Sequence, residues 1–167
     1  MYQIGDQVVY GIHGVCNIVE QEKRVVDRKT VTYLVLEPVG QDGSRYLVPT
    51  HNQAAMGKLR PMLSPAELEN LLHSSEIRED GWIREENLRK AAYKELITSG
   101  DRAGLLKMIY SLYNHKKNQM ASGKKVHLAD DNFLRDAEKL LASEISVVMN
   151  LPADEARAYL RKEMKAE

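Results

Sequence analysis

The period of the apolar residues changes near residue 64, and this change constrains the fold more than any other feature of the sequence. Upstream, short runs rich in Val, Ile, Thr and Tyr are separated by turn residues, which is typical of strands. Downstream, apolar residues recur every three or four positions, which is typical of amphipathic helices. A chain of 167 residues has room for two small domains. We therefore predict an α+β protein, with a β-domain at 1–60 and an α-helical domain at 61–167.

The first domain is predicted to be a small β-barrel, because short strands at close spacing are typical of barrels. The expected strands lie at 7–11, 15–21, 30–38 and 44–49, with turns at 11–14, 26–30 and 40–43. Sixty residues bury only a small core, so closure of the sheet would add to its stability.

The second domain begins with a helix-start signal. Ser64 is a candidate N-cap, Pro65 fits the first helical position, and Glu67 completes a capping box. We expect about five helices, at 65–73, after Trp82 with an end near Gly100, and at 101–119, 129–149 and 152–165. The apolar stripe of the second helix is expected at Leu88, Ala92 and Leu96.

Composition narrows the class of protein. No apolar run approaches the roughly 18 residues of a membrane span, and the N-terminus lacks the basic start and apolar stretch of a signal peptide. A single cysteine, Cys16, cannot form an internal disulfide. We therefore expect a cytoplasmic protein that makes no contact with a membrane.

Motifs that carry enzyme chemistry are absent from the sequence. There is no G-x-S-x-G nucleophile elbow, no phosphate-binding G-x-x-x-x-G-K-[ST] and no G-x-G-x-x-G. His13 and Cys16 have a possible metal-ligand spacing but no second pair, so a polar turn beside a buried thiol is the better interpretation. Asp130 and Asp131 are adjacent on a helix and point about 100° apart, which fits favourable contact with the helix dipole better than paired catalysis. We expect no enzyme, no metal, no cofactor and no small-molecule substrate.

The only tryptophan, Trp82, lies in the charged stretch REDGWIREEN. It opens a segment, 78–125, that holds 11 basic and 6 acidic residues, a net charge of +5. If the second helix extended back to it, Trp82 would lie about 120° from the Leu88 stripe. Two interpretations follow. The ring can fold back onto another helix as a hydrophobic staple, or it can be an exposed aromatic that stacks on or wedges beside a base.

The sequence resembles the CarD/CdnL family of bacterial transcription regulators. The resemblance rests on IGDQVVYGIHGVCNIVEQEKR at 4–24, YLVLEP at 33–38, LVPT at 47–50, the single tryptophan near the start of the second domain, and SGD at 99–101. It covers nearly the whole chain, and G-D-x-V-V-Y-x-x-H-G is its most specific part. It implies an N-terminal Tudor-like/SH3-like barrel, like the polymerase-interacting domain of transcription-repair coupling factors, followed by a helical domain.

The resemblance also implies the partners. The barrel would dock on the β subunit of RNA polymerase, and the helical domain would contact promoter DNA at the upstream edge of the melted bubble, with a tryptophan wedged in the minor groove. The expected polymerase contacts are Arg24, Val26, Arg45 and Leu47. The expected DNA contacts are Trp82, Arg84, Arg89, Lys90, Lys116, Lys117, Lys124 and Lys125. Such a protein would associate with the nucleoid through RNA polymerase.

The charge and the composition of the helices limit how such a protein could bind DNA. Few phosphate contacts give weak non-specific binding to free DNA, and no helix carries a set of Arg, Asn and Gln suited to reading the major groove. The alternative is a polymerase-bound adaptor whose helices contact another protein and not DNA. A small hydrolase or transferase is disfavoured by the lack of converging polar groups.

Overall fold

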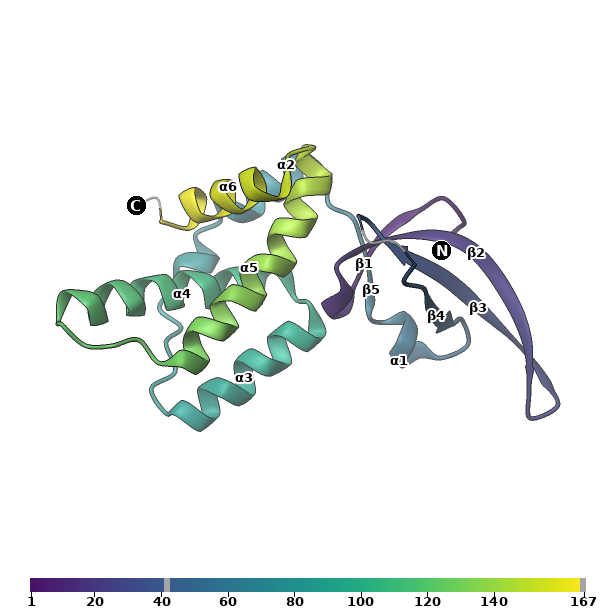
Figure 1. Ribbon diagram of the computed structural model, residues 1–167, viewed down its shortest axis with the longest axis horizontal. Helices are drawn as coiled ribbons and strands as arrows, with labels where there is room; N and C mark the ends of the chain where they lie inside the picture. The colour runs from purple at the N-terminus through teal and green to yellow at the C-terminus, as the bar shows by residue number, and fades with distance from the viewer. Residues whose placement is uncertain (41–42, 166–167) are drawn as a thin grey trace. The chain divides into compact units, whose positions relative to one another are not determined.

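The computed structural model describes residues 1–40 and 43–165. The chain divides into two compact units, Met1–Met62 and Leu63–Glu167 (Figure 1). Gln41 and Asp42, which belong to the turn predicted at 40–43, lie outside the described residues.

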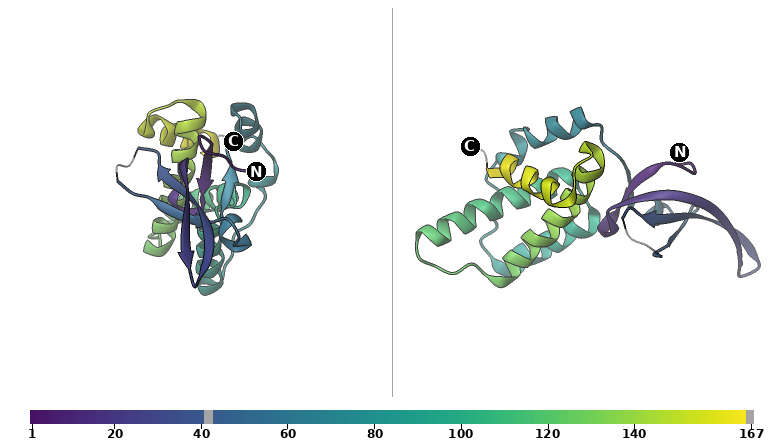
Figure 2. Two further views of the ribbon diagram at one scale, coloured as in Figure 1. Left: turned by 90° about the vertical axis from the view of Figure 1, so that its right-hand side faces the viewer. Right: turned by 45° about the horizontal axis from the view of Figure 1, so that its top comes forward.

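The N-terminal unit is built on an antiparallel sheet. Its strands are β1 (Gln7–Tyr10), β2 (Val15–Val26), β3 (Lys29–Pro38), β4 (Tyr46–Pro49) and β5 (Leu59–Pro61), in the order β4-β3-β2-β1-β5. A 3₁₀ turn, η1 (Gly11–His13), follows β1, and a short helix, α1 (Gln53–Met56), follows β4. β2 and β3 form a long curved hairpin, which Figure 2 shows from two sides. Its two-residue turn places Asp27 at φ 50° and Arg28 at φ 64°, which matches a type I′ turn.

One face of this sheet encloses a small core. Its buried members are Val8, Cys16, Ile18, Leu34, Leu36, Val48 and Leu59. The sheet also carries a bulge between Ile18 and Glu20, which changes which β2 side chains face this core.

The second unit is helical. It contains α2 (Pro65–Leu72), a 3₁₀ turn η2 (Glu76–Arg78), α3 (Glu86–Ser99), α4 (Arg102–Ala121), α5 (Leu128–Met149) and α6 (Ala153–Lys165). The capping box of α2 is formed, since the Ser64 hydroxyl accepts from the Glu67 N–H and the Glu67 carboxylate accepts from the Ser64 N–H, both at 3.1 Å. Gly100 ends α3 in the left-handed conformation, at φ 68°. Helix α5 packs against α3, α4 and α6 and so organises the unit.

The α+β fold with a β-rich module followed by about five helices is confirmed, but the predicted inward face of the second helix is only partly right, since Leu96 packs against the core and Leu88 does not. Leu88 is 64% exposed, whereas Arg89 and Tyr93 are the buried residues of α3. Helix α3 also begins at Glu86, so Trp82 lies in the irregular segment before it. The carboxylate of Glu85 caps α3 by accepting from the N–H groups of Asn87 and Leu88. The acidic stretch after Trp82 therefore starts a helix.

Candidate functional site

The expected polymerase contacts lie on one face of the sheet, opposite the small core. In antiparallel pairs, residues directly opposite each other point to the same side, and alternate residues along a strand share that side. Leu47 lies opposite Val35, and Val35 lies opposite Glu20. Arg24 and Val26 follow Glu20 at even spacing on β2, and Arg45 precedes Leu47 by two residues. We call the set Arg24, Val26, Arg45 and Leu47 the outer sheet face.

Ion pairs agree with this placement. The Arg45 guanidinium donates to the Glu37 carboxylate at 2.9 Å and lies 3.6 Å from the Glu20 carboxylate. Arg24 donates to Glu22 at 3.0 Å on the same strand. Both arginine side chains are more than half exposed. Exposed pairs of this kind contribute about 0–1 kcal/mol, so a partner can recruit either arginine at little cost.

Trp82 is half-buried and packs on the helical core. Its ring stacks on the imidazole of His115 on α4, with centroids 3.7 Å apart and planes 14° from parallel. The Arg89 guanidinium carbon lies 4.5 Å from the ring centroid, which is a cation–π contact. The ring is therefore held against the helical core in this chain, as the staple interpretation requires.

Arg89 is not placed as an exposed phosphate contact, which corrects the expectation from its position beside Lys90. It is 3% exposed and forms a bidentate pair with Asp130 on α5, at 2.9 and 3.0 Å. Its remaining nitrogen donates to the carbonyls of Ile83 and Arg84, at 3.1 and 3.4 Å. A buried arginine needs such a carboxylate, because an unpaired charge in the core is costly. Arg89 ties the Trp82 segment to α5.

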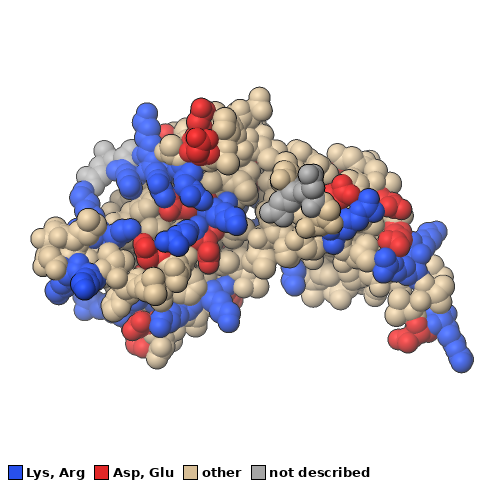
Figure 3. All heavy atoms as spheres, in the orientation of Figure 1, with Lys and Arg blue, Asp and Glu red and all other residues tan. Residues whose placement is uncertain are grey.

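The other expected DNA contacts differ in their exposure and in the ion pairs that they form. Lys90 pairs with Glu86 at 3.1 Å, and Lys116 pairs with Asp131 at 3.0 Å. The rest are exposed side chains, namely Arg84, Lys117, Lys124 and Lys125. Lys124 and Lys125 lie in the loop between α4 and α5. Figure 3 shows Lys and Arg side chains gathered over one face of the helical unit, with fewer acidic groups among them.

The charge of the basic segment is partly compensated from within the helical unit. Asp130, Asp131 and Glu144, all on α5, pair with Arg89, Lys116 and Arg102 respectively. Segment 126–167 holds 6 basic and 9 acidic residues, so its net charge of −3 offsets part of the +5. The surface field toward DNA is therefore weaker than the charge of the segment alone indicates.

Sequence reasoning missed His115 and the role of Asp130. Burial lowers the pKa of His115 below its ordinary value, which favours the neutral imidazole that stacks on Trp82. Asp130 was assigned to the helix dipole, but it is 2% exposed and serves as the partner of Arg89. No local pattern in the sequence marks Arg89 as buried, so nothing in the sequence pointed to Asp130 as its partner.

His13 and Cys16 do not form a metal-ligand pair. The His13 ring packs on Tyr46 at 4.1 Å, whereas the Cys16 thiol lies in the core of the sheet, where burial raises its pKa to about 11. Within residues 1–40 and 43–165, no three His, Cys, Asp or Glu side chains are grouped to hold a metal ion. In the same residues, no helix combines the length and hydropathy needed to cross a bilayer.

Comparison with known proteins finds a match to a known domain in the sheet unit and a distant relative of the whole chain. Residues 2–62 match the model of the CarD-like/TRCF RID domain, which coincides with the sheet unit. A Bacillus subtilis (strain 168) protein named "Putative transcription factor YdeB" is 22% identical over 161 residues, spanning 95% of this chain and 99% of that protein. This second match runs through the helical unit as well, and neither comparison names an enzyme. Residues 2–62 are therefore similar to a CarD-like/TRCF RID domain, and the chain as a whole is similar to a protein named as a putative transcription factor.

Proposed function

We propose that this protein is a transcription regulator that docks on the β subunit of RNA polymerase through its outer sheet face and stabilises the promoter open complex through the helical unit. The observation that carries the docking step is the shared placement of Arg24, Val26, Arg45 and Leu47. Two exposed cations beside apolar Val26 and Leu47 form a mixed surface, which is typical of transient protein interfaces.

The DNA step assigns Trp82 as a wedge in the minor groove at the upstream edge of the bubble. Its support is positional, because the half-buried ring sits in an irregular segment with exposed Arg84 two residues on. The His115 stack and the Arg89 contact hold the ring in one orientation. A wedge held in this way loses less conformational entropy on insertion than a freely rotating side chain.

Tethering accounts for how so weakly charged a protein engages DNA. Non-specific binding with few phosphate contacts has a Kd of about 10⁻⁴ to 10⁻⁶ M at physiological salt. Docking on polymerase would raise the effective concentration at the bubble to about the millimolar range. A wedge that contacts only melted DNA then stabilises the open complex by its differential affinity for that state.

Charge reversal on the outer sheet face tests the docking step. Arg24→Glu and Arg45→Glu should each weaken binding to the isolated β subunit by about tenfold, equivalent to 1.4 kcal/mol, in surface plasmon resonance. Lys58→Glu is the matched control, since it makes the same charge change outside β2, β3 and β4. Wild-type affinity in both arginine variants would place the docking surface elsewhere.

The alternative function is a polymerase-bound adaptor without DNA contact. The packing of Trp82 on the core favours it, because a structural staple needs no DNA partner. Permanganate footprinting of promoter complexes separates the two functions. A wedge prolongs thymine reactivity at the upstream bubble edge when the protein is added, whereas an adaptor binds polymerase and leaves the footprint unchanged.

A further inference from the structure

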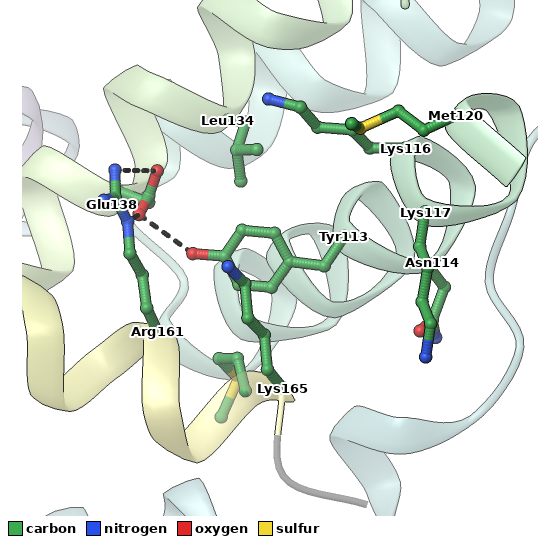
Figure 4. Close-up of a pocket in the computed structure, with 10 residues that line it drawn as sticks. Tyr113, Asn114, Lys116, Lys117, Met120, Leu134, Glu138, Arg161 and Lys165 are labelled. Atoms are coloured by element: carbon green, nitrogen blue, oxygen red, sulfur yellow. Dashed lines mark hydrogen bonds and ion pairs between the residues drawn. The ribbon is translucent and has the colours of Figure 1, made fainter. Parts of the chain in front are cut away.

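A hollow on the helical unit, distinct from the Trp82 contacts, opens between α4, α5 and α6. Its volume is about 610 Å³, within the range of about 300–1,000 Å³ that is usual for small-molecule sites. Side chains from all three helices line it, as Figure 4 shows: Tyr113, Asn114, Lys116, Lys117, Met120, Leu134, Glu138, Arg161, Met164 and Lys165. We call it the α4–α6 pocket.

The charge of this pocket is strongly unbalanced. Its lining holds four cations, Lys116, Lys117, Arg161 and Lys165, against one carboxylate, Glu138, which leaves a net of +3. Asp131, the partner of Lys116, lies outside the lining and offsets part of this charge. A concave surface focuses such charge more strongly than a flat one, so the pocket attracts an anion with more than one negative charge.

The one carboxylate is already engaged. Glu138 is 4% exposed and accepts from the Arg161 guanidinium at 2.6 Å and from the Tyr113 hydroxyl at 2.9 Å. Burial and this hydrogen bond raise the pKa of Tyr113, so its hydroxyl stays a donor to Glu138. Figure 4 shows Tyr113 and Arg161 converging on Glu138 from opposite sides. Glu138 therefore orients the two side chains and repels a bound anion less than a free carboxylate would.

Apolar groups complete the lining. Tyr113, Met120, Leu134 and Met164 present an aromatic ring, two thioethers and an isobutyl group. The Lys165 ammonium lies 5.1 Å from the centre of the Tyr113 ring. Since a lysine side chain is long and flexible, it can turn from the ring to a phosphate and leave the ring open for stacking. The pocket thus offers a planar apolar contact beside a cationic one.

We infer that the α4–α6 pocket binds a phosphorylated small molecule with an aromatic body, of the nucleotide class. The lysines would hold the phosphates as point charges, and the Tyr113 ring with the methionines would hold the base. This binding is independent of polymerase docking and of the Trp82 wedge. A phosphate of the DNA backbone has the same charge chemistry, but a single phosphate brings no aromatic body to fill the apolar part of the pocket.

Titration of the full chain by ¹H–¹⁵N NMR tests this inference, with ATP, inorganic triphosphate and a short DNA duplex as separate probes. ATP should produce saturable shifts at Tyr113, Leu134 and Met164. The double variant Lys117→Gln/Lys165→Gln should weaken the affinity for ATP by at least about tenfold. The control variant Lys139→Gln/Lys162→Gln removes two exposed charges from α5 and α6 outside the lining. It should leave the affinity for ATP unchanged. Tyr113→Leu should weaken the binding of ATP but not the binding of inorganic triphosphate.

Three results would overturn the inference. The first is an absence of saturable shifts with ATP. The second is equal loss of affinity in the two double-lysine variants, which would indicate a diffuse charge effect. The third is a response to duplex DNA alone, which would assign the pocket to the DNA backbone. Circular dichroism of each variant confirms that the helices are intact, so that a lost shift reports binding.

Discussion

The buried pair between Arg89 and Asp130 gives the sharpest prediction about this fold. Asp130→Asn removes the only carboxylate that contacts the Arg89 guanidinium in the described residues, while the two carbonyls that Arg89 also contacts carry no full charge. The arginine side chain is 4% exposed, so solvent cannot replace the lost partner. Breaking a buried pair in this way costs about 3–5 kcal/mol.

Asp131 supplies a matched control one residue away. Its pair with Lys116 has a similar length, 3.0 Å, but the two side chains are 33% and 41% exposed. Asp131→Asn should therefore cost no more than about 1 kcal/mol. The contrast between the two variants isolates burial as the cause, because the chemical change is the same.

Urea unfolding followed by far-UV circular dichroism measures both costs. Asp130→Asn should lower the midpoint strongly with little change in slope, and the near-UV signal of Trp82 should weaken, since Arg89 contacts that ring. Arg89→Met/Asp130→Leu should recover much of the loss, because a well-packed apolar pair avoids the desolvation penalty. Equal small costs in Asp130→Asn and Asp131→Asn would refute the reasoning.

Three further predictions concern single residues. Burial lowers the pKa of His115, so neutral His115 stabilises the helical unit above pH 6.5, and this stability is lost as the pH falls from 6.5 through the lowered pKa. The urea midpoint should therefore drop over this pH range, and His115→Phe should remove the part of the drop that His115 causes. Cys16 should resist iodoacetamide at pH 8 in the folded chain and react once urea unfolds it, because it is fully buried and its pKa is raised to about 11; fast native labelling would contradict its position. Gly100→Ala should cost about 1–2 kcal/mol in thermal unfolding because φ there is 68°, and an unchanged melting temperature would show that another conformation ends α3.

Local signals account for what the sequence predicted well. The Ser64–Glu67 capping box and Gly100 are short-range features, and each lies where a helix begins or ends. Arg45 lies on the side of Leu47, as strand alternation alone predicts. The turn predicted at 26–30 is present as the type I′ turn at Asp27 and Arg28, but β2 continues to Val26, beyond its predicted end at residue 21. The extension was missed because Glu22, Lys23 and Arg24 are charged and carry no apolar strand pattern.

Long-range pairing accounts for what the sequence did not predict. The phase of α3 was misjudged because Arg89 counts as polar, and only Asp130, 41 residues later, makes its burial tolerable. The partner of Trp82, His115, lies on another helix, so no local pattern reveals the stack. β5 was missed because its three residues, Leu59–Pro61, are too short and proline-containing to stand out, and pairing with β1 defines it.

The lifetime of the promoter open complex tests the central claim most directly. Polymerase and promoter would be mixed with wild-type protein, with Trp82→Ala, or with Ile83→Ala as the neighbouring control, after circular dichroism has shown each variant folded. Heparin challenge then measures the decay of the complex. The proposal predicts that wild-type and Ile83→Ala prolong the lifetime, whereas Trp82→Ala binds polymerase normally and loses most of that effect. An equal lifetime with wild-type and Trp82→Ala would contradict the wedge and leave Trp82 a structural staple.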